Sequence, residues 1–205
     1  MRLFFYRCFP GFGNCYVLGT DDDSGSREAV IVDPGSIDNK IIDDIEGNGY
    51  TLRAVLITHE HKRHVYGLRT LKRIYDVGIF AMNSSIMEFT TTQVKDADKI
   101  SIGPFNLEVI AIPGHSADSA IFLIDRLLFT GDVLTAGLVG STQSSYGAAA
   151  QMNGIQNRIL TMPGDYTVLP GHGPPSTLEA ERRFNVGINQ YRENHDRRQG
   201  FRVDL

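Results

Sequence analysis

Three histidines lie close together directly after an apolar run. His59 and His61 follow the strand-like run Leu52–Thr58, and His64 comes where the next helix should begin. In extended backbone, side chains two residues apart point to the same side, so both first imidazoles can face one ion. Imidazole nitrogens at this spacing suit Zn²⁺, with iron and manganese as alternatives. The cluster therefore predicts a metal site.

Three further candidate ligands each lie in a glycine-containing loop after an apolar run. They occur in Gly114-His115-Ser116, Thr130-Gly131-Asp132 and Pro170-Gly171-His172. Glycine permits the sharp turn at a strand end and lets backbone pack closely around a metal, and ligand sites of α/β folds are built at strand ends. A lone histidine is usually an ordinary core or surface residue, which is how we interpret His195. A chance His-x-His-x-x-His, in contrast, has odds of roughly one in two hundred.

The elements that carry these residues alternate between strands and helices. The strand-like runs are Leu3–Cys8, Cys15–Leu18, Ala29–Val32, Leu52–Thr58, Leu107–Ile112, Ile121–Ile124, Leu127–Thr130 and Tyr166–Leu169. Apolar spacing predicts helices from about Ile37, after His64, over Ala148–Leu160, and from Leu178 to about Arg197. A capping box, Ser176-Thr177-Leu178-Glu179, opens the last helix. Apolar strands alternating with amphipathic helices indicate the α/β class, with a sheet covered on both faces by helices.

Length and composition restrict the class of protein. The 205 residues predict one domain over residues 1–205. A formal charge of −4 disfavours nucleic acid and anionic membranes as partners. We expect a small-molecule substrate. Two cysteines, Cys8 and Cys15, make no disulfide framework and are expected to be reduced core thiols. The apolar N-terminus is too short for a signal peptide and no run approaches a membrane span, so we expect a cytoplasmic protein. The oligomeric state stays open.

The segment Thr58–His64, followed by Gly67, resembles the signature of the metallo-β-lactamase superfamily. The three glycine-containing loops match the remaining metal motifs of that superfamily in order, and Asn14–Val17 and Val32–Gly35 match its opening strands. The similarity covers nearly the whole chain and is closest to short glyoxalase II-like hydrolases, which Pro170–Asn185 resembles in particular. The resemblance implies a four-layer α-β-β-α sandwich with metals at one edge of the two sheets.

The resemblance also implies a ligand set and a reaction. The first metal would be held by His59, His61 and His115, Asp132 would bridge, and the second metal would use His64 and His172. In the family, a hydroxide between the metals attacks a carbonyl carbon, since bound Zn²⁺ lowers the pKa of water from about 15.7 to about 7. The implied function is a metal-dependent hydrolase that cleaves a thioester or related acyl ester with a metal-bound hydroxide.

Arg63 stands where the family has an aspartate that ligates the second metal. If the guanidinium points inward to about 4 Å from a dication, the repulsion between the two charges would cost roughly 8 kcal/mol at an effective dielectric of about 20. If it points to solvent, only the aliphatic stem of the side chain would pack against the protein. In one interpretation a single metal occupies the first site, and Asp132 completes or orients it. In another, Arg63 replaces the second cation by pairing with Asp132 or with an anionic substrate group. In a third, the site binds without turnover.

We favour the first two interpretations because His64 and His172 are kept, and we predict about one tightly bound metal per chain. Asp132 and Arg63 are the candidate catalytic residues.

Two other function classes stay open. Persulfide dioxygenases share this fold and use one iron held by two histidines and an aspartate, which would correspond to His59, His115 and Asp132. A degenerate, non-catalytic binding module would turn over no substrate. Classical glyoxalase II has an added helical region that helps hold glutathione, but only one helix and a tail are expected after His172. Ser141-Thr142-Gln143 also replaces a segment that is commonly charged in short relatives, so the sequence does not indicate substrate specificity.

Overall fold

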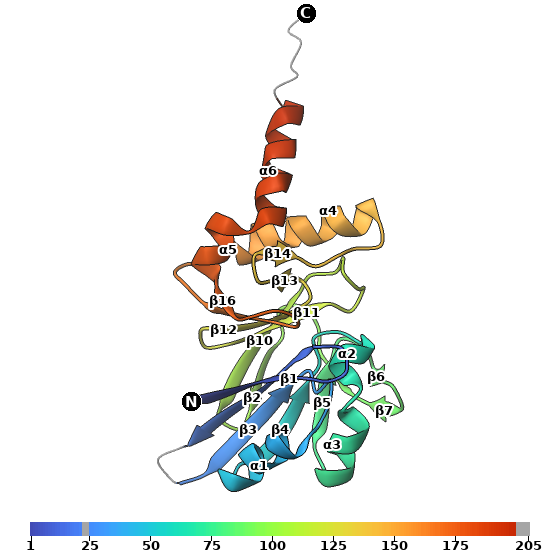
Figure 1. Ribbon diagram of the computed structural model, residues 1–205, viewed down its shortest axis with the longest axis vertical. Helices are drawn as coiled ribbons and strands as arrows, with labels where there is room; N and C mark the ends of the chain where they lie inside the picture. The colour runs from blue at the N-terminus through green and yellow to red at the C-terminus, as the bar shows by residue number, and fades with distance from the viewer. Residues whose placement is uncertain (22–24, 200–205) are drawn as a thin grey trace, which may run out of the picture.

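The computed structural model describes the backbone of residues 1–21 and 25–199. The side chains of residues 194–199 lie outside the described part, and with them that of His195, which we interpreted as an ordinary core or surface residue. Two six-stranded sheets face each other, and helices cover the outer face of each (Figure 1). The chain therefore has the four-layer α-β-β-α sandwich that the resemblance implies.

The first sheet combines an antiparallel and a parallel half. Its strand order is β1-β2-β3-β4-β5-β8. The pairs β1–β2 and β2–β3 are antiparallel, whereas β3, β4, β5 and β8 run parallel. The strands are β1 (Arg2–Arg7), β2 (Asn14–Asp21), β3 (Arg27–Val32), β4 (Thr51–Leu56), β5 (Gly78–Ala81) and β8 (Thr92–Gln93).

The second sheet has the order β16-β15-β12-β11-β10-β9 and one parallel pair, β12 with β15. Its other pairs are antiparallel. The strands are β9 (Lys99–Ile102), β10 (Phe105–Ala111), β11 (Ala120–Ile124), β12 (Leu127–Gly131), β15 (Thr167–Pro170) and β16 (Ser176–Thr177). Two small hairpins are formed by β6 (Ser85–Ile86) with β7 (Phe89–Thr90), and by β13 (Leu134–Thr135) with β14 (Leu138–Val139).

Each sheet is covered by its own group of helices. Those on the first sheet are α1 (Asn39–Gly47), α2 (Lys62–Val65) and α3 (Leu68–Ile74). Those on the second are α4 (Ser145–Gly154), its π-helical continuation η1 (Ile155–Ile159) and α5 (Leu178–Phe184). The last helix, α6 (Val186–Gln199), begins beside β14 and then projects away from the sheet (Figure 1). Among the described residues, no helix has both the length and the apolar character needed to span a membrane.

Three hydrophobic cores separate the four layers. Successive side chains of a strand point to opposite faces, and β3 illustrates the result. Val30 and Val32 pack in the core between the two sheets, whereas Ile31 packs in the core beneath α1 and α3. The third core lies between the second sheet and its helices, where Leu128 packs with Ile155. Burial on both faces explains why the strands are continuous apolar runs.

Three sequence-based expectations were wrong. The expected sheet with helices on both faces is instead two stacked sheets, because a strand buried against a second sheet has the same apolar pattern as one buried against helices. The last helix is divided at Asn185, whose backbone is extended. The Asn185 Oδ1 accepts from the Ile188 N–H and begins α6. The cap of α5 is Thr177, which accepts from the Ala180 N–H, and not Ser176.

Candidate metal centre

The six candidate ligands lie at the carboxyl ends of four strands. His59 and His61 follow β4, and His64 lies in the short helix α2. The other three follow β10, β12 and β15, and they are His115, Asp132 and His172. These strand ends meet because the sheets are joined at this edge: the Ala120 N–H donates to Thr58 O (2.9 Å), and the Asn14 N–H donates to Gly171 O (2.7 Å).

His59, His61, His115 and Asp132 form one group of potential ligand atoms, all within 4.8 Å of one another. The His61 Nδ1 lies 2.9 Å from His59 Nε2 and 3.0 Å from His115 Nε2. The Asp132 Oδ2 lies 3.8 Å from His59 Nε2 and 3.5 Å from His115 Nε2. Atoms bound at about 2 Å to a tetrahedral ion are about 3.3 Å apart. This first cluster therefore fits one four-coordinate divalent ion.

His64, His172 and Asp132 form a second group with the same spacing. The Asp132 Oδ2 lies 3.5 Å from both His64 Nε2 and His172 Nε2. Two of the atoms here are buried and have no hydrogen-bond partner among the described residues, namely His64 Nε2 and Asp132 Oδ1. A buried polar atom without a partner is costly, and a metal ion would satisfy both. This second cluster also fits a metal, with three protein ligands instead of four.

Four of the imidazole rings are held so that Nε2 faces the clusters, because an oxygen atom lies close to Nδ1 on the opposite side of each ring. The Nδ1 atoms of His59 and His115 face Thr58 Oγ1 (3.1 Å) and Ser141 O (2.7 Å). Those of His64 and His172 face Asp33 Oδ2 (3.0 Å) and Phe12 O (3.2 Å). An Nδ1–H that donates to oxygen leaves the Nε2 lone pair available to an ion.

Asp33 supports the site from a buried position that sequence reasoning missed as functional. Its carboxylate accepts from the Thr58 N–H (2.8 Å) and Thr58 Oγ1–H (2.7 Å), in addition to its contact with His64. The residue directly follows β3, so the strand-end rule that indicated the ligands also applies to it. Gly171 is equally constrained, because an added Cβ would lie 2.4 Å from Asp132 Oδ1 and 2.6 Å from His64 Cε1.

The two clusters differ in protonation when no metal is bound. Burial, together with the charge of His64, lowers the pKa of His59 to about 3, and burial with His115 lowers the pKa of His61. Burial also disfavours the charged form of His64, but the carboxylates of Asp33 and Asp132 outweigh it and raise its pKa to about 10. A metal at the second cluster must therefore displace a proton from His64, whereas the first cluster offers neutral imidazoles.

Arg63 does not point into either cluster as an ion-pair partner. Asp132 is within ion-pair distance of four histidines. The Arg63 side chain is exposed, and its stem lies against Gly11, where an added Cβ would be 3.2 Å from Arg63 Cγ. Within the described residues, its guanidinium has no hydrogen-bond or ion-pair partner. It lines a pocket of about 470 Å³ over the ligands, which also contains His61, His115 and His172.

Comparison with known proteins identifies the family. The family model of the metallo-beta-lactamase superfamily matches residues 8–172. The probable metallo-hydrolase YqgX of Bacillus subtilis (strain 168) is 30% identical over 205 residues, which covers 89% of this chain and 95% of that protein. The hydroxyacylglutathione hydrolase of Chromohalobacter salexigens is 32% identical over 166 residues, or 80% of this chain and 64% of that enzyme. The chain therefore belongs to the metallo-β-lactamase superfamily.

A solved structure leads to the same fold. The crystal structure of BLEG-1 B3 metallo-beta-lactamase superposes with a TM-score of 0.80 at 26% identity and covers 91% of this chain and 99% of that one. The glyoxalase II-like resemblance is confirmed by the hydroxyacylglutathione hydrolases among the relatives. The superfamily includes metallo-hydrolases, and this chain has a histidine and aspartate cluster able to hold a divalent ion.

Proposed function

We propose that this protein is a metal-dependent hydrolase of a thioester or related acyl ester. The observation that carries the proposal is the first cluster, in which three imidazoles and one carboxylate converge. Three of these four ligands, His61, His115 and Asp132, also line the pocket. The names of two relatives, a metallo-hydrolase and a hydroxyacylglutathione hydrolase, support the same class of reaction.

The first cluster would hold the ion. His59 and His61 carry lowered pKa values, so both are neutral and able to ligate at pH 7. A bound divalent ion such as Zn²⁺ lowers the pKa of its water to about 7 and so supplies a nucleophile for a carbonyl carbon. Asp132 would complete this set of ligands through its Oδ2, which lies 3.5 Å from His115 Nε2.

Arg63 has a separate role at the pocket mouth. Hydrolysis of an acyl ester produces a carboxylate. Arg63 is one of the residues that line the pocket over the ligands, and its guanidinium has no ion-pair partner among the described residues. A guanidinium matches the fork geometry of a carboxylate. We assign Arg63 to the binding of the product carboxylate or of an anionic group of the substrate.

Hydrolysis and metal identity together test the proposal. The assay measures thiol release from a panel of acyl thioesters by the protein loaded with Zn²⁺. We expect turnover by the wild type and by Asp96→Asn, a carboxylate change at a distant ion pair with Arg158, and none by His59→Ala. No release of thiol from any acyl thioester, together with no release of alcohol from acyl esters, would overturn the proposal. Oxygen consumption with a persulfide by the iron-loaded protein, without thiol release, would instead support a dioxygenase.

A further inference from the structure

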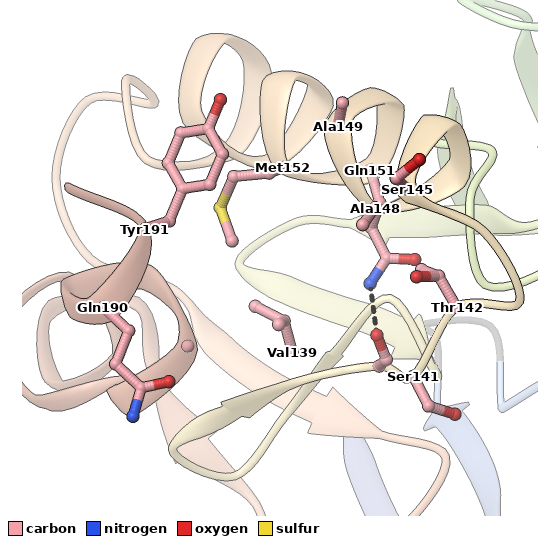
Figure 2. Close-up of a pocket in the computed structure, with 12 residues that line it drawn as sticks. Val139, Ser141, Thr142, Ser145, Ala148, Ala149, Gln151, Met152, Gln190 and Tyr191 are labelled. Carbon is pink, nitrogen blue, oxygen red and sulfur yellow. Dashed lines mark hydrogen bonds between the residues drawn. The ribbon is translucent and has the colours of Figure 1, made fainter. Parts of the chain in front are cut away.

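A second pocket of about 670 Å³ lies beside the pocket over the metal ligands. It is enclosed by the loop Val139–Thr142, one side of α4 and the beginning of α6 (Figure 2), and we call it the α4–α6 pocket. The two pockets share three lining residues, Val139, Gly140 and Ser141. A substrate whose carbonyl group lies at the first cluster can therefore extend across this loop into the α4–α6 pocket.

The lining of the α4–α6 pocket is uncharged. Met152 and Tyr191 supply apolar surface, and Ser145, Gln151 and Gln190 supply polar groups (Figure 2). The lining residues include no Asp, Glu, Lys, Arg or His. A charged group entering this space would lose water without gaining a counterion, which is unfavourable. The pocket therefore favours a neutral part of the substrate.

Gln151 lines the pocket and has a side-chain acceptor without a partner among the described residues. The residue is only 2% exposed, and its Nε2–H₂ donates to Gly140 O (2.9 Å) and Val133 O (3.4 Å). Because both of these partners are carbonyl oxygens, the amide nitrogen must face them and Oε1 must face the other way. The Oε1 is buried and has no hydrogen-bond partner among the described residues. Such an acceptor favours a ligand that brings an N–H or O–H donor.

We infer that the α4–α6 pocket binds the thiol portion of a thioester substrate, and that this portion is an uncharged chain with an amide N–H that donates to Gln151 Oε1. The inference rests on the proposed function and names its substrate class: thioesters of neutral, amide-bearing thiols, in preference to thiols that carry ionised carboxylates. Gln151 is then a specificity-determining residue.

Three non-hydrolysable thioethers test the pocket directly by calorimetry with the metal-loaded protein. S-hexyl-N-acetylcysteamine carries an amide N–H, 2-(hexylthio)ethyl acetate replaces that N–H with oxygen, and 3-(hexylthio)propanoate carries a carboxylate. We expect the amide to bind at least about tenfold more tightly than either of the others, which corresponds to about 1.4 kcal/mol. Equal binding of the three would overturn the inference.

Two matched substitutions on α4 place a charge inside and outside the pocket. Ala149 lines it, whereas Asn153 is exposed on the same helix and does not. We expect Ala149→Lys to reverse the preference toward the carboxylate probe by at least about tenfold, and Asn153→Lys to leave it unchanged. An unchanged preference in Ala149→Lys would overturn the inference.

Gln151→Leu should abolish the difference in affinity between S-hexyl-N-acetylcysteamine and 2-(hexylthio)ethyl acetate. Gln151 also holds Gly140, so circular dichroism is used to check that the variant folds, and Ala149→Lys decides the matter if it does not. Because binding is measured without turnover, the two proposals fail separately. Selective binding of the amide with no thioester cleavage would refute only the hydrolase, and cleavage without selective binding would refute only the pocket assignment.

Discussion

Replacement of Asp33 by asparagine should weaken the second cluster and leave the first nearly intact. Asp33 has a left-handed backbone (φ 50°), a conformation that asparagine tolerates well, so the change tests the carboxylate and not the fold. The Asn oxygen still accepts from the Thr58 N–H. Its amide Nδ2–H₂ then faces His64 Nδ1, where a carboxylate oxygen now lies at 3.0 Å.

The new donor changes the tautomer of His64. An amide that donates to Nδ1 forces the ring proton onto Nε2, the atom that lies 3.5 Å from Asp132 Oδ2, so the lone pair needed by an ion is lost. Loss of such a supporting hydrogen bond costs about 10- to 100-fold in metal affinity. Exchange of two charge-assisted hydrogen bonds for neutral ones should also lower the free energy of unfolding by about 2–4 kcal/mol.

Titration of metal-free protein with Zn²⁺ in competition with a chelator resolves the two affinities. For Asp33→Asn we expect the weaker equivalent to bind about 10- to 100-fold less tightly and the tighter one to change by less than about threefold. Asp96→Asn, at an ion pair with Arg158, serves as the control and should change neither affinity. If Asp33→Asn binds both equivalents as the wild type does, or loses the tighter one first, the assigned role of Asp33 is wrong.

Three other perturbations have defined outcomes. Arg63→Asp adds a carboxylate beside the second cluster and should raise the metal content above one equivalent; unchanged stoichiometry in elemental analysis would count against it. The free energy of unfolding of the metal-free protein, measured in urea, should be highest near pH 6.5, which is the pKa of a histidine in the unfolded chain. On each side of this pH it should fall by about 1.4 kcal/mol per pH unit for each proton by which the folded and unfolded states differ. It falls toward acid because the pKa of folded His59 is lowered to about 3, and toward alkali because that of folded His64 is raised to about 10; a flat profile would refute both assignments. Asp118→Ala removes the acceptor of the Glu60 N–H (2.8 Å) between two ligands and should weaken the first cluster about 10-fold, whereas wild-type affinity would show that this contact does not position the ligands.

Among the described residues, the sequence predicted eight of the sixteen strands. It also predicted every residue of the two clusters, because strand-end histidines after apolar runs are a local signal. Strands β5–β9, β13, β14 and β16 were not predicted, because each spans only two to four residues and several are partly exposed. The supporting roles of Asp33 and Asp118 were also missed. Each depends on a contact with a distant segment: Asp33 reaches His64, and Asp118 reaches Glu60. Periodicity does not report such contacts.

The neutral lining of the α4–α6 pocket was likewise hidden in the sequence. Its walls come from three segments that meet only in the folded chain, namely Val139–Thr142, α4 and α6. From the charge of Arg63 and its position in the histidine motif, the sequence allowed two orientations of the side chain, toward the metal ligands or toward solvent. The stem contact with Gly11 distinguishes between them, and that contact joins α2 to the β1–β2 hairpin across a large distance in sequence.

The number of tightly bound metal ions in three proteins tests the proposed centre most directly. Elemental analysis of protein purified without added metal should find about one equivalent in the wild type and in His172→Ala, which changes only the second cluster. It should find almost none in His115→Ala, which removes a ligand of the first. Two full equivalents in the wild type, or an unchanged metal content in His115→Ala, would contradict the assignment of a single tight site to His59, His61, His115 and Asp132.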